Sequence, residues 1–173
     1  AFSSSDSCVA CLSASMATTL KDALRHRRRA SIALSGGRSP KAVLTRLASS
    51  DVDWSRIDVT LTDDRWVPPD DDASNEKLAN ESFLKVGAGA ASFFGLRSEG
   101  HTLRTGVIAA SRRLAGCSFP LDVVYLGVGL DGHVASLFPS AAWARFLGRG
   151  RCVLGRSPVE PKNRISLDLE TLL

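Results

Sequence analysis

Residues 121–139 read LDVVYLGVGLDGHVASLFP, and this stretch decides the expected fold. Residues 121–126 are almost continuously apolar and are followed at once by glycine, which is typical of a strand buried on both faces. The run lacks the strict alternation of apolar and polar residues that marks a strand with one face in water. We therefore expect residues 121–126 to be the strongest strand of a parallel sheet, followed by a glycine-rich loop.

The rest of the chain alternates between strand-like and helix-like patterns of apolar residues. Strands are predicted at residues 31–34, 57–62, 92–94, 151–154 and 164–167, and helices at residues 13–28, 40–47, 75–84 and 105–114. This alternation favours a parallel sheet with helices on both faces. Without an internal repeat or an evident linker, we expect a flexible N-terminal segment at residues 1–12 and a single α/β domain at residues 13–173.

The composition is that of a soluble globular protein. Of 173 residues, 44% are hydrophobic and 23% charged, and no apolar run approaches the roughly 18 residues of a membrane span. The net charge of +4 owes much to residues 25–29, RHRRR. Such a cluster suits a nucleic-acid or membrane surface, or a helix end whose dipole it offsets. We favour the helix end, because no aromatic residues interleave with the arginines for base stacking, and we expect neither nucleic acid nor membrane as a partner.

The four cysteines are Cys8, Cys11, Cys117 and Cys152. The Cys8-x-x-Cys11 spacing is compatible with half of a zinc site or with a redox pair, but no second close pair of Cys or His follows. We favour free thiols in a reducing compartment, and therefore a cytoplasmic location. Import into an organelle is a weaker alternative, suggested only by the Ser-rich opening of the chain.

A first polar loop, SGGRSP at residues 35–40, follows a predicted strand. Ligands of an open parallel sheet gather at the carboxyl ends of its strands. Gly36 and Gly37 let the backbone approach a ligand, the next helix offers free N–H groups, and Arg38 adds positive charge. We expect a phosphate site here, although a plain strand-to-helix turn has the same glycines. The dinucleotide pattern G-x-G-x-x-G is missing, which disfavours an oxidoreductase.

Two further loops follow strands in the same way. In TDDRWVP, residues 62–68, Asp63 and Arg65 lie against the strand end and suit sugar hydroxyls and phosphate. The aspartates of residues 70–72 are expected to form only a solvated loop tip.

The loop after residues 121–126 carries the candidate for proton transfer. His133 follows the strand and its glycines, and Asp131 stands two residues before it and can orient it. The backbone N–H groups of Gly129 and Gly132 are candidate donors to a developing oxyanion.

These loops, in this order, resemble the signatures of the 6-phosphogluconolactonase family. That family typically reads S-G-G-x-[ST]-P, then T-D-E-R-x-V-P with S-N further on, then L-G-x-G-x-D-G-H-x-A-S-L-F-P. Residues 161–167, PKNRISL, are similar to its P-x-x-R-[IV]-[ST]-L segment, so the resemblance covers roughly residues 13–173. Related glucosamine-6-phosphate isomerase/deaminases share D-G-H but continue towards A-F-N-E-P, so the ASLFP of residues 135–139 favours the lactonase.

The resemblance implies an open, mainly parallel, Rossmann-like αβα sandwich that hydrolyses 6-phospho-D-glucono-1,5-lactone in the pentose phosphate pathway. It implies no metal and no organic cofactor, a sugar phosphate lactone as the small-molecule partner, and a monomer or weak homodimer. Carried over residue by residue, it makes His133 the general base, Asp131 and Asp63 the acidic partners, and assigns substrate and phosphate binding to Gly36, Gly37, Arg38, Arg65 and Arg164.

The chain departs from the family pattern in places. Asp64 stands where Glu is usual, and Ser140 where Gly often follows. Family members also continue past residues 164–167 by a further strand and helix, so the domain is expected to be C-terminally incomplete. Two alternatives stay open: an amino-sugar phosphate deaminase or isomerase, and a catalytically degenerate sugar-phosphate-binding domain.

Overall fold

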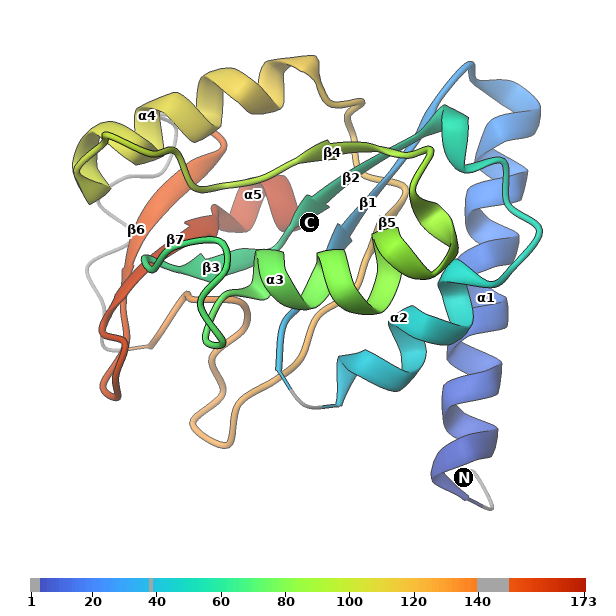
Figure 1. The fold of residues 1–173 in the computed structure, drawn as a ribbon, viewed down its shortest axis with the longest axis horizontal. Helices are drawn as coiled ribbons and strands as arrows, with labels where there is room; N and C mark the ends of the chain where they lie inside the picture. Colours follow the sequence, from blue (N-terminus) through green and yellow to red (C-terminus); the bar gives the residue numbers. More distant parts are fainter. Residues whose placement is uncertain (1–3, 38, 140–149) are drawn as a thin grey trace.

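The computed structural model describes residues 4–37, 39–139 and 150–173. It contains a parallel sheet in the order β4-β2-β1-β5 and a smaller antiparallel sheet in the order β3-β7-β6 (Figure 1). The strands are β1 (Ala30–Leu34), β2 (Ile57–Leu61), β3 (Asp63–Arg65), β4 (Ser92–Phe94), β5 (Val123–Val124), β6 (Cys152–Arg156) and β7 (Asn163–Leu167). The expected α/β fold with a mainly parallel central sheet in a single domain is confirmed.

The helices fill the connections between these strands. The α-helices are α1 (Ser5–His26), α2 (Pro40–Ala48), α3 (Asn75–Ala79), α4 (Leu103–Arg113) and α5 (Leu169–Leu172). A π-helix, η2 (Asn80–Ala88), continues α3, and two 3₁₀ turns are η1 (Trp54–Arg56) and η3 (Leu114–Gly116). None of the described helices combines the length and the apolar character that crossing a membrane requires.

The centre of the parallel sheet is its most buried part. Every residue of β1 and of β2 is buried, and the two strands pair in register from Ala30–Ile57 to Leu34–Leu61. On one side α1 packs on β1 and α2, and α2 packs on η2 (Figure 1). Because residues on both faces of β1 and β2 are buried, these strands are apolar without alternation.

The expected strand at residues 121–126 is shorter and less buried than predicted. Only Val123–Val124 pair as a strand, at the edge beside β1, and both residues are half-buried. Backbone N–H groups of Asp122 and Tyr125 continue the bonding to β1 on either side. An edge strand has a neighbour on one side only, and the composition of the run could not reveal that position in the sheet.

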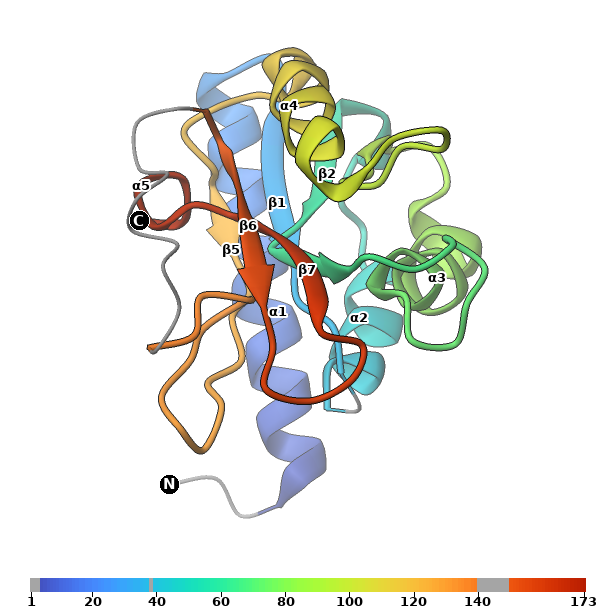
Figure 2. The same cartoon turned by 90° about the vertical axis from the view of Figure 1, so that its left-hand side faces the viewer.

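The antiparallel sheet is a correction to the expected topology. The predicted strands at residues 151–154 and 164–167 exist, but they pair with each other and with β3 rather than joining the parallel sheet. The connection between β6 and β7 is short, which suits antiparallel neighbours and not a parallel crossover. Figure 2 shows this pair of strands with α4, which packs on both.

The N-terminal helix begins earlier than predicted. It starts at Ser5, so most of the segment that we expected to be flexible, residues 1–12, is helical. The Ser4 hydroxyl accepts a hydrogen bond from the Ser7 N–H, and the Ser7 hydroxyl accepts one from the Ser4 N–H. This capping box stabilises the first turn of the helix. Periodicity alone missed this start because the first turns carry small side chains with little hydrophobic signal.

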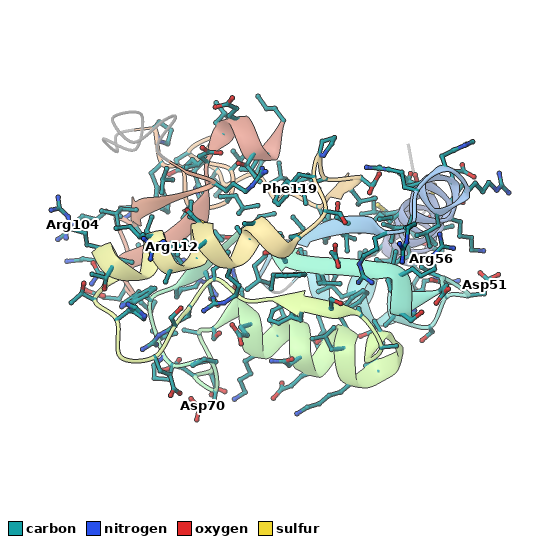
Figure 3. The ribbon with its side chains drawn as sticks, turned by 90° about the horizontal axis from the view of Figure 1, so that it is seen from above. Asp51, Arg56, Asp70, Arg104, Arg112 and Phe119 are labelled. Carbon is teal, nitrogen blue, oxygen red and sulfur yellow. The ribbon has the colours of Figure 1, made fainter. Side chains whose placement is uncertain are left out.

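The basic cluster of residues 25–29 marks the end of α1, as expected. Arg27 pairs with Asp122, and Arg29 Nε donates to Asp58 Oδ1 at 2.8 Å. Arg56, beside α1 in Figure 3, donates to the Leu24 and Arg27 carbonyls at 3.0 and 2.8 Å. These contacts give the cluster a structural role at the amino ends of the parallel strands.

Candidate active site

The polar loops converge on one cavity of about 470 Å³. It lies where β1, β2 and β5 end, because parallel strands bring their carboxyl ends to the same edge of the sheet. Its wall includes most of the residues predicted from sequence: Gly36, Asp63, Arg65, Gly129, Asp131, His133 and Arg164.

The other two predicted glycines lie just outside this wall. Gly37 and Gly132 occupy turns beside the cavity, with φ of 105° and 82°, a backbone region that favours glycine. Arg38, predicted as a phosphate ligand, and Ser140 fall outside the described residues.

His133 and Asp131 form a pair at the cavity wall. The Nδ1 of His133 lies 2.5 Å from Oδ1 of Asp131, and this hydrogen bond lowers the pKa of the carboxyl group. The His133 side chain remains 31% exposed, and its ring centroid lies 4.5 Å from that of Phe138. In the tautomer that donates from Nδ1 to the carboxylate, Nε2 is the ring nitrogen left to accept a proton.

The predicted oxyanion donors are engaged within their own loop. The N–H of Gly129 donates to the His133 carbonyl, and the N–H of Gly132 donates to the Gly129 carbonyl, each at 2.9 Å. In this conformation both groups close the turn that presents His133, and the oxyanion role expected of them stays a prediction. Sequence could locate the glycines but not the partners of their N–H groups.

Asp63 connects the second and third loops. Its side chain is buried, and Oδ2 accepts from the Ser136 hydroxyl at 2.5 Å. Oδ1 lies within 3.4 Å of the Thr62 hydroxyl and of Nδ2 of Asn75. The carboxylate is therefore fixed at the cavity wall by neighbours on both sides. The catalytic role expected of it stays a prediction.

Arg65 and Arg164 form the cationic wall of the cavity. Nη1 of Arg65 donates to the Ala73 carbonyl at 2.8 Å and to Oδ1 of Asn75 at 3.0 Å, while Nε of Arg164 donates to the Pro161 carbonyl at 2.8 Å. No hydrogen bond to a described residue occupies Nη2 of Arg65 or either terminal nitrogen of Arg164. Burial, followed by the nearby charge of Arg65, lowers the pKa of Arg164. An anion between the two groups would stabilise the charged form of Arg164 and so offset this lowering of its pKa.

Asp64, the departure from the family pattern, points away from the cavity. Its oxygens accept the N–H groups of Arg65, Asn75 and Glu76 and the Ser74 hydroxyl. Burial raises the pKa of this carboxyl to about 6, and the bonds from the N–H groups act in the opposite direction. The residue supports the start of α3.

Among the buried residues in or next to the cavity wall that sequence reasoning missed are Asn75 and Ser136. Both lie inside motifs that were quoted, Asn75 in the S-N that follows the second loop and Ser136 in ASLFP. Their roles depend on contacts between loops, which a motif does not specify.

The buried thiols of Cys117 and Cys152 are not suited to act as nucleophiles, and the described residues form no cluster of metal ligands. Burial raises the pKa of Cys117 and of Cys152 to about 12, which makes both thiols poor nucleophiles. Throughout the described ranges, no three His, Cys, Asp or Glu side chains gather as a metal site would require.

Comparison with known proteins matches residues 3–173 to the family model of glucosamine-6-phosphate isomerases/6-phosphogluconolactonase. The chain is 40% identical to a 6-phosphogluconolactonase of Rhizobium meliloti (strain 1021) over 87% of the chain and 62% of that protein. It is 38% identical to one of Pseudomonas aeruginosa, over 90% of the chain and 67% of the relative. The chain thus spans about two thirds of the length of these curated relatives.

The fold agrees with the sequence matches. The crystal structure of a 6-phosphogluconolactonase from Shewanella baltica OS155 superposes with a TM-score of 0.94 at 35% identity, over 99% of this chain and 74% of that one. A family model that matches nearly the whole chain, relatives that are about 40% identical and a shared fold agree with one another. The chain therefore belongs to the glucosamine-6-phosphate isomerase/6-phosphogluconolactonase family.

Proposed function

We propose that this site hydrolyses 6-phospho-D-glucono-1,5-lactone to 6-phosphogluconate, as part of the pentose phosphate pathway. One observation carries the proposal: a single cavity brings the His133–Asp131 pair together with the guanidinium groups of Arg65 and Arg164. The guanidinium groups suit the phosphate, and the pair suits activation of water. Relatives named 6-phosphogluconolactonase support the choice of substrate.

The reaction begins with the phosphate held by the free nitrogens of Arg65 and Arg164. Nε2 of His133 takes a proton from a water molecule while the oxygen of that water bonds to the C1 carbonyl carbon of the lactone. The tetrahedral intermediate collapses, the bond from C1 to the ring oxygen breaks, and His133 returns the proton to that oxygen. Asp131 keeps the imidazole oriented and stabilises its protonated form through the 2.5 Å bond at Nδ1.

The test is the rate of lactone hydrolysis above the spontaneous rate, for the wild type and His133→Ala. General-base catalysis contributes about 10²–10⁴-fold, so the variant should lose that much. His101→Ala, in an exposed loop where the ring contacts Thr105, is the matched control and should retain full activity.

Three outcomes would contradict the proposal. Full activity in His133→Ala would remove His133 as the base. Release of ammonia from glucosamine 6-phosphate, without lactone hydrolysis, would assign the chain to the isomerase/deaminase branch of the family. A wild type with neither activity would indicate the degenerate sugar-phosphate binder.

A further inference from the structure

Asn75 lies at the point where the first two loops meet. Its side chain is buried at the start of α3 and lines the cavity. Nδ2 donates to the main-chain carbonyl of Asp63 at 2.9 Å, and Oδ1 accepts from Nη1 of Arg65 at 3.0 Å. One amide thus connects the backbone of the second loop with the guanidinium group that the same loop presents.

The same amide fills the space beside Gly36. A Cβ placed on Gly36 would overlap Oδ1, Cγ and Nδ2 of Asn75. The amide can therefore pack against the backbone at residue 36 only because this residue has no side chain. Gly36 therefore has a steric reason to be glycine in addition to any contact with a ligand. Asn75 sets the distance between the first loop and Arg65.

The orientation of Arg65 depends on this contact. The two hydrogens of Nη1 are used by the Ala73 carbonyl and by Oδ1 of Asn75, which leaves Nη2 as the free terminal nitrogen. Without Oδ1, a single carbonyl would hold the terminal end of the guanidinium group. Arg164 nearby carries like charge, so a loosened Arg65 would turn away from it.

We propose that Asn75 is the positioning residue of the anion site: it fixes the guanidinium group of Arg65 against the Gly36 backbone, and thereby sets the affinity for a phosphorylated ligand. The inference rests on the proposed function for the identity of the ligand. It requires no contact between Asn75 and the reacting atoms, because Asn75 acts through Arg65.

A double-mutant cycle on the full chain tests this. The dissociation constants of inorganic phosphate and of 6-phosphogluconate are measured for the wild type, Asn75→Ala, Arg65→Ala and the double variant, with thermal unfolding to confirm that each is folded. Asn75→Ala should weaken binding about tenfold, the loss expected for one hydrogen bond to a charged group. In the Arg65→Ala background it should cause no further loss. Asn80→Ala, a half-buried amide in η2, is the matched control and should bind as the wild type.

A second cycle uses the contact with Gly36. Gly36→Ala should weaken binding as much as Asn75→Ala, because the new Cβ displaces the amide. In the Asn75→Ala background, Gly36→Ala should cause a smaller loss than in the wild type, because the new Cβ then enters the space that the amide has left. In lactone hydrolysis, Asn75→Ala should raise KM about tenfold and lower kcat by less, because His133 and Asp131 are untouched and the Asp63 carboxylate loses only a 3.4 Å contact.

The outcomes separate this inference from the proposed function. An equal loss from Asn75→Ala in both Arg65 backgrounds, or no loss in the wild-type background, would overturn the positioning role. A wild type that binds neither anion would overturn it as well. A wild type that binds phosphate with the expected coupling, but hydrolyses no lactone, would reject the lactonase reaction and leave the role of Asn75 intact.

Discussion

Gly129, in the third loop, packs closely against the imidazole ring of His133. A Cβ on Gly129 would overlap the imidazole ring of His133 and would lie 2.8 Å from Oδ1 of Asp131. We expect Gly129→Ala to displace the pair and to slow lactone hydrolysis at least about 10²-fold, approaching the effect of removing the base. Steady-state rates of the purified variant measure this.

Gly127→Ala in the same loop is the matched control. Its Cβ would meet the Ser35 hydroxyl at 3.9 Å, an ordinary contact. The rate should therefore stay close to that of the wild type. Equal rates for both variants would mean that the position of His133 does not depend on close packing against residue 129.

At the scale of an element, Asp64 couples the start of α3 to pH. The pKa of its carboxyl is about 6 in the folded chain and near 3.8 in the unfolded chain. The folded state therefore binds the proton more tightly, and the free energy of unfolding falls as pH rises from about 4 to about 6. The pKa difference corresponds to about 2–3 kcal/mol.

Urea unfolding of the wild type and Asp64→Asn across this pH range checks the prediction. The stability advantage of the wild type over the variant should be larger at the acidic end and should shrink as pH rises. Near pH 4 the protonated carboxyl can still accept N–H groups through both oxygens, whereas the NH2 group of Asn accepts none, so the variant should be less stable at the acidic end. A difference that does not change with pH would show that Asp64 has no raised pKa.

At the scale of the whole molecule, Thr62 joins the two sheets. Its N–H donates to the Leu34 carbonyl of β1 at 2.9 Å, and its carbonyl accepts from the Leu167 N–H of β7 at 2.8 Å. Residues of both sheets also share one apolar core, in which Leu34, Leu61 and Leu167 are all buried. The two sheets should therefore unfold together.

Thiol labelling in increasing urea tests this cooperativity. Cys117 is buried beside the parallel sheet and Cys152 within the antiparallel one, with 7% and 4% of their surfaces exposed. The two cysteines should become reactive at the same midpoint, which should also be the midpoint of the loss of helical circular dichroism. Labelling of Cys152 at a clearly lower urea concentration would show that the antiparallel sheet opens separately.

Sequence was enough for the features that depend on neighbouring residues. The buried strands β1 and β2 follow from apolar runs without alternation, and α2 follows from Pro40 and the apolar face behind it. The convergence of His133, Asp131, Asp63 and Arg65 also followed from sequence, because each comes after a parallel strand and such strands end at one edge of the sheet.

The sequence by itself thus determined the parallel sheet, the loops that carry the chemistry and the family. Only the tertiary structure decided which polar groups meet. Asn75 against Gly36, Ser136 against Asp63 and the pairing of β3 with β7 are contacts between segments that are distant along the chain. The physical reason is that a hydrogen bond depends on position and direction in space, whereas periodicity and motif spacing report only the local conformation of the backbone.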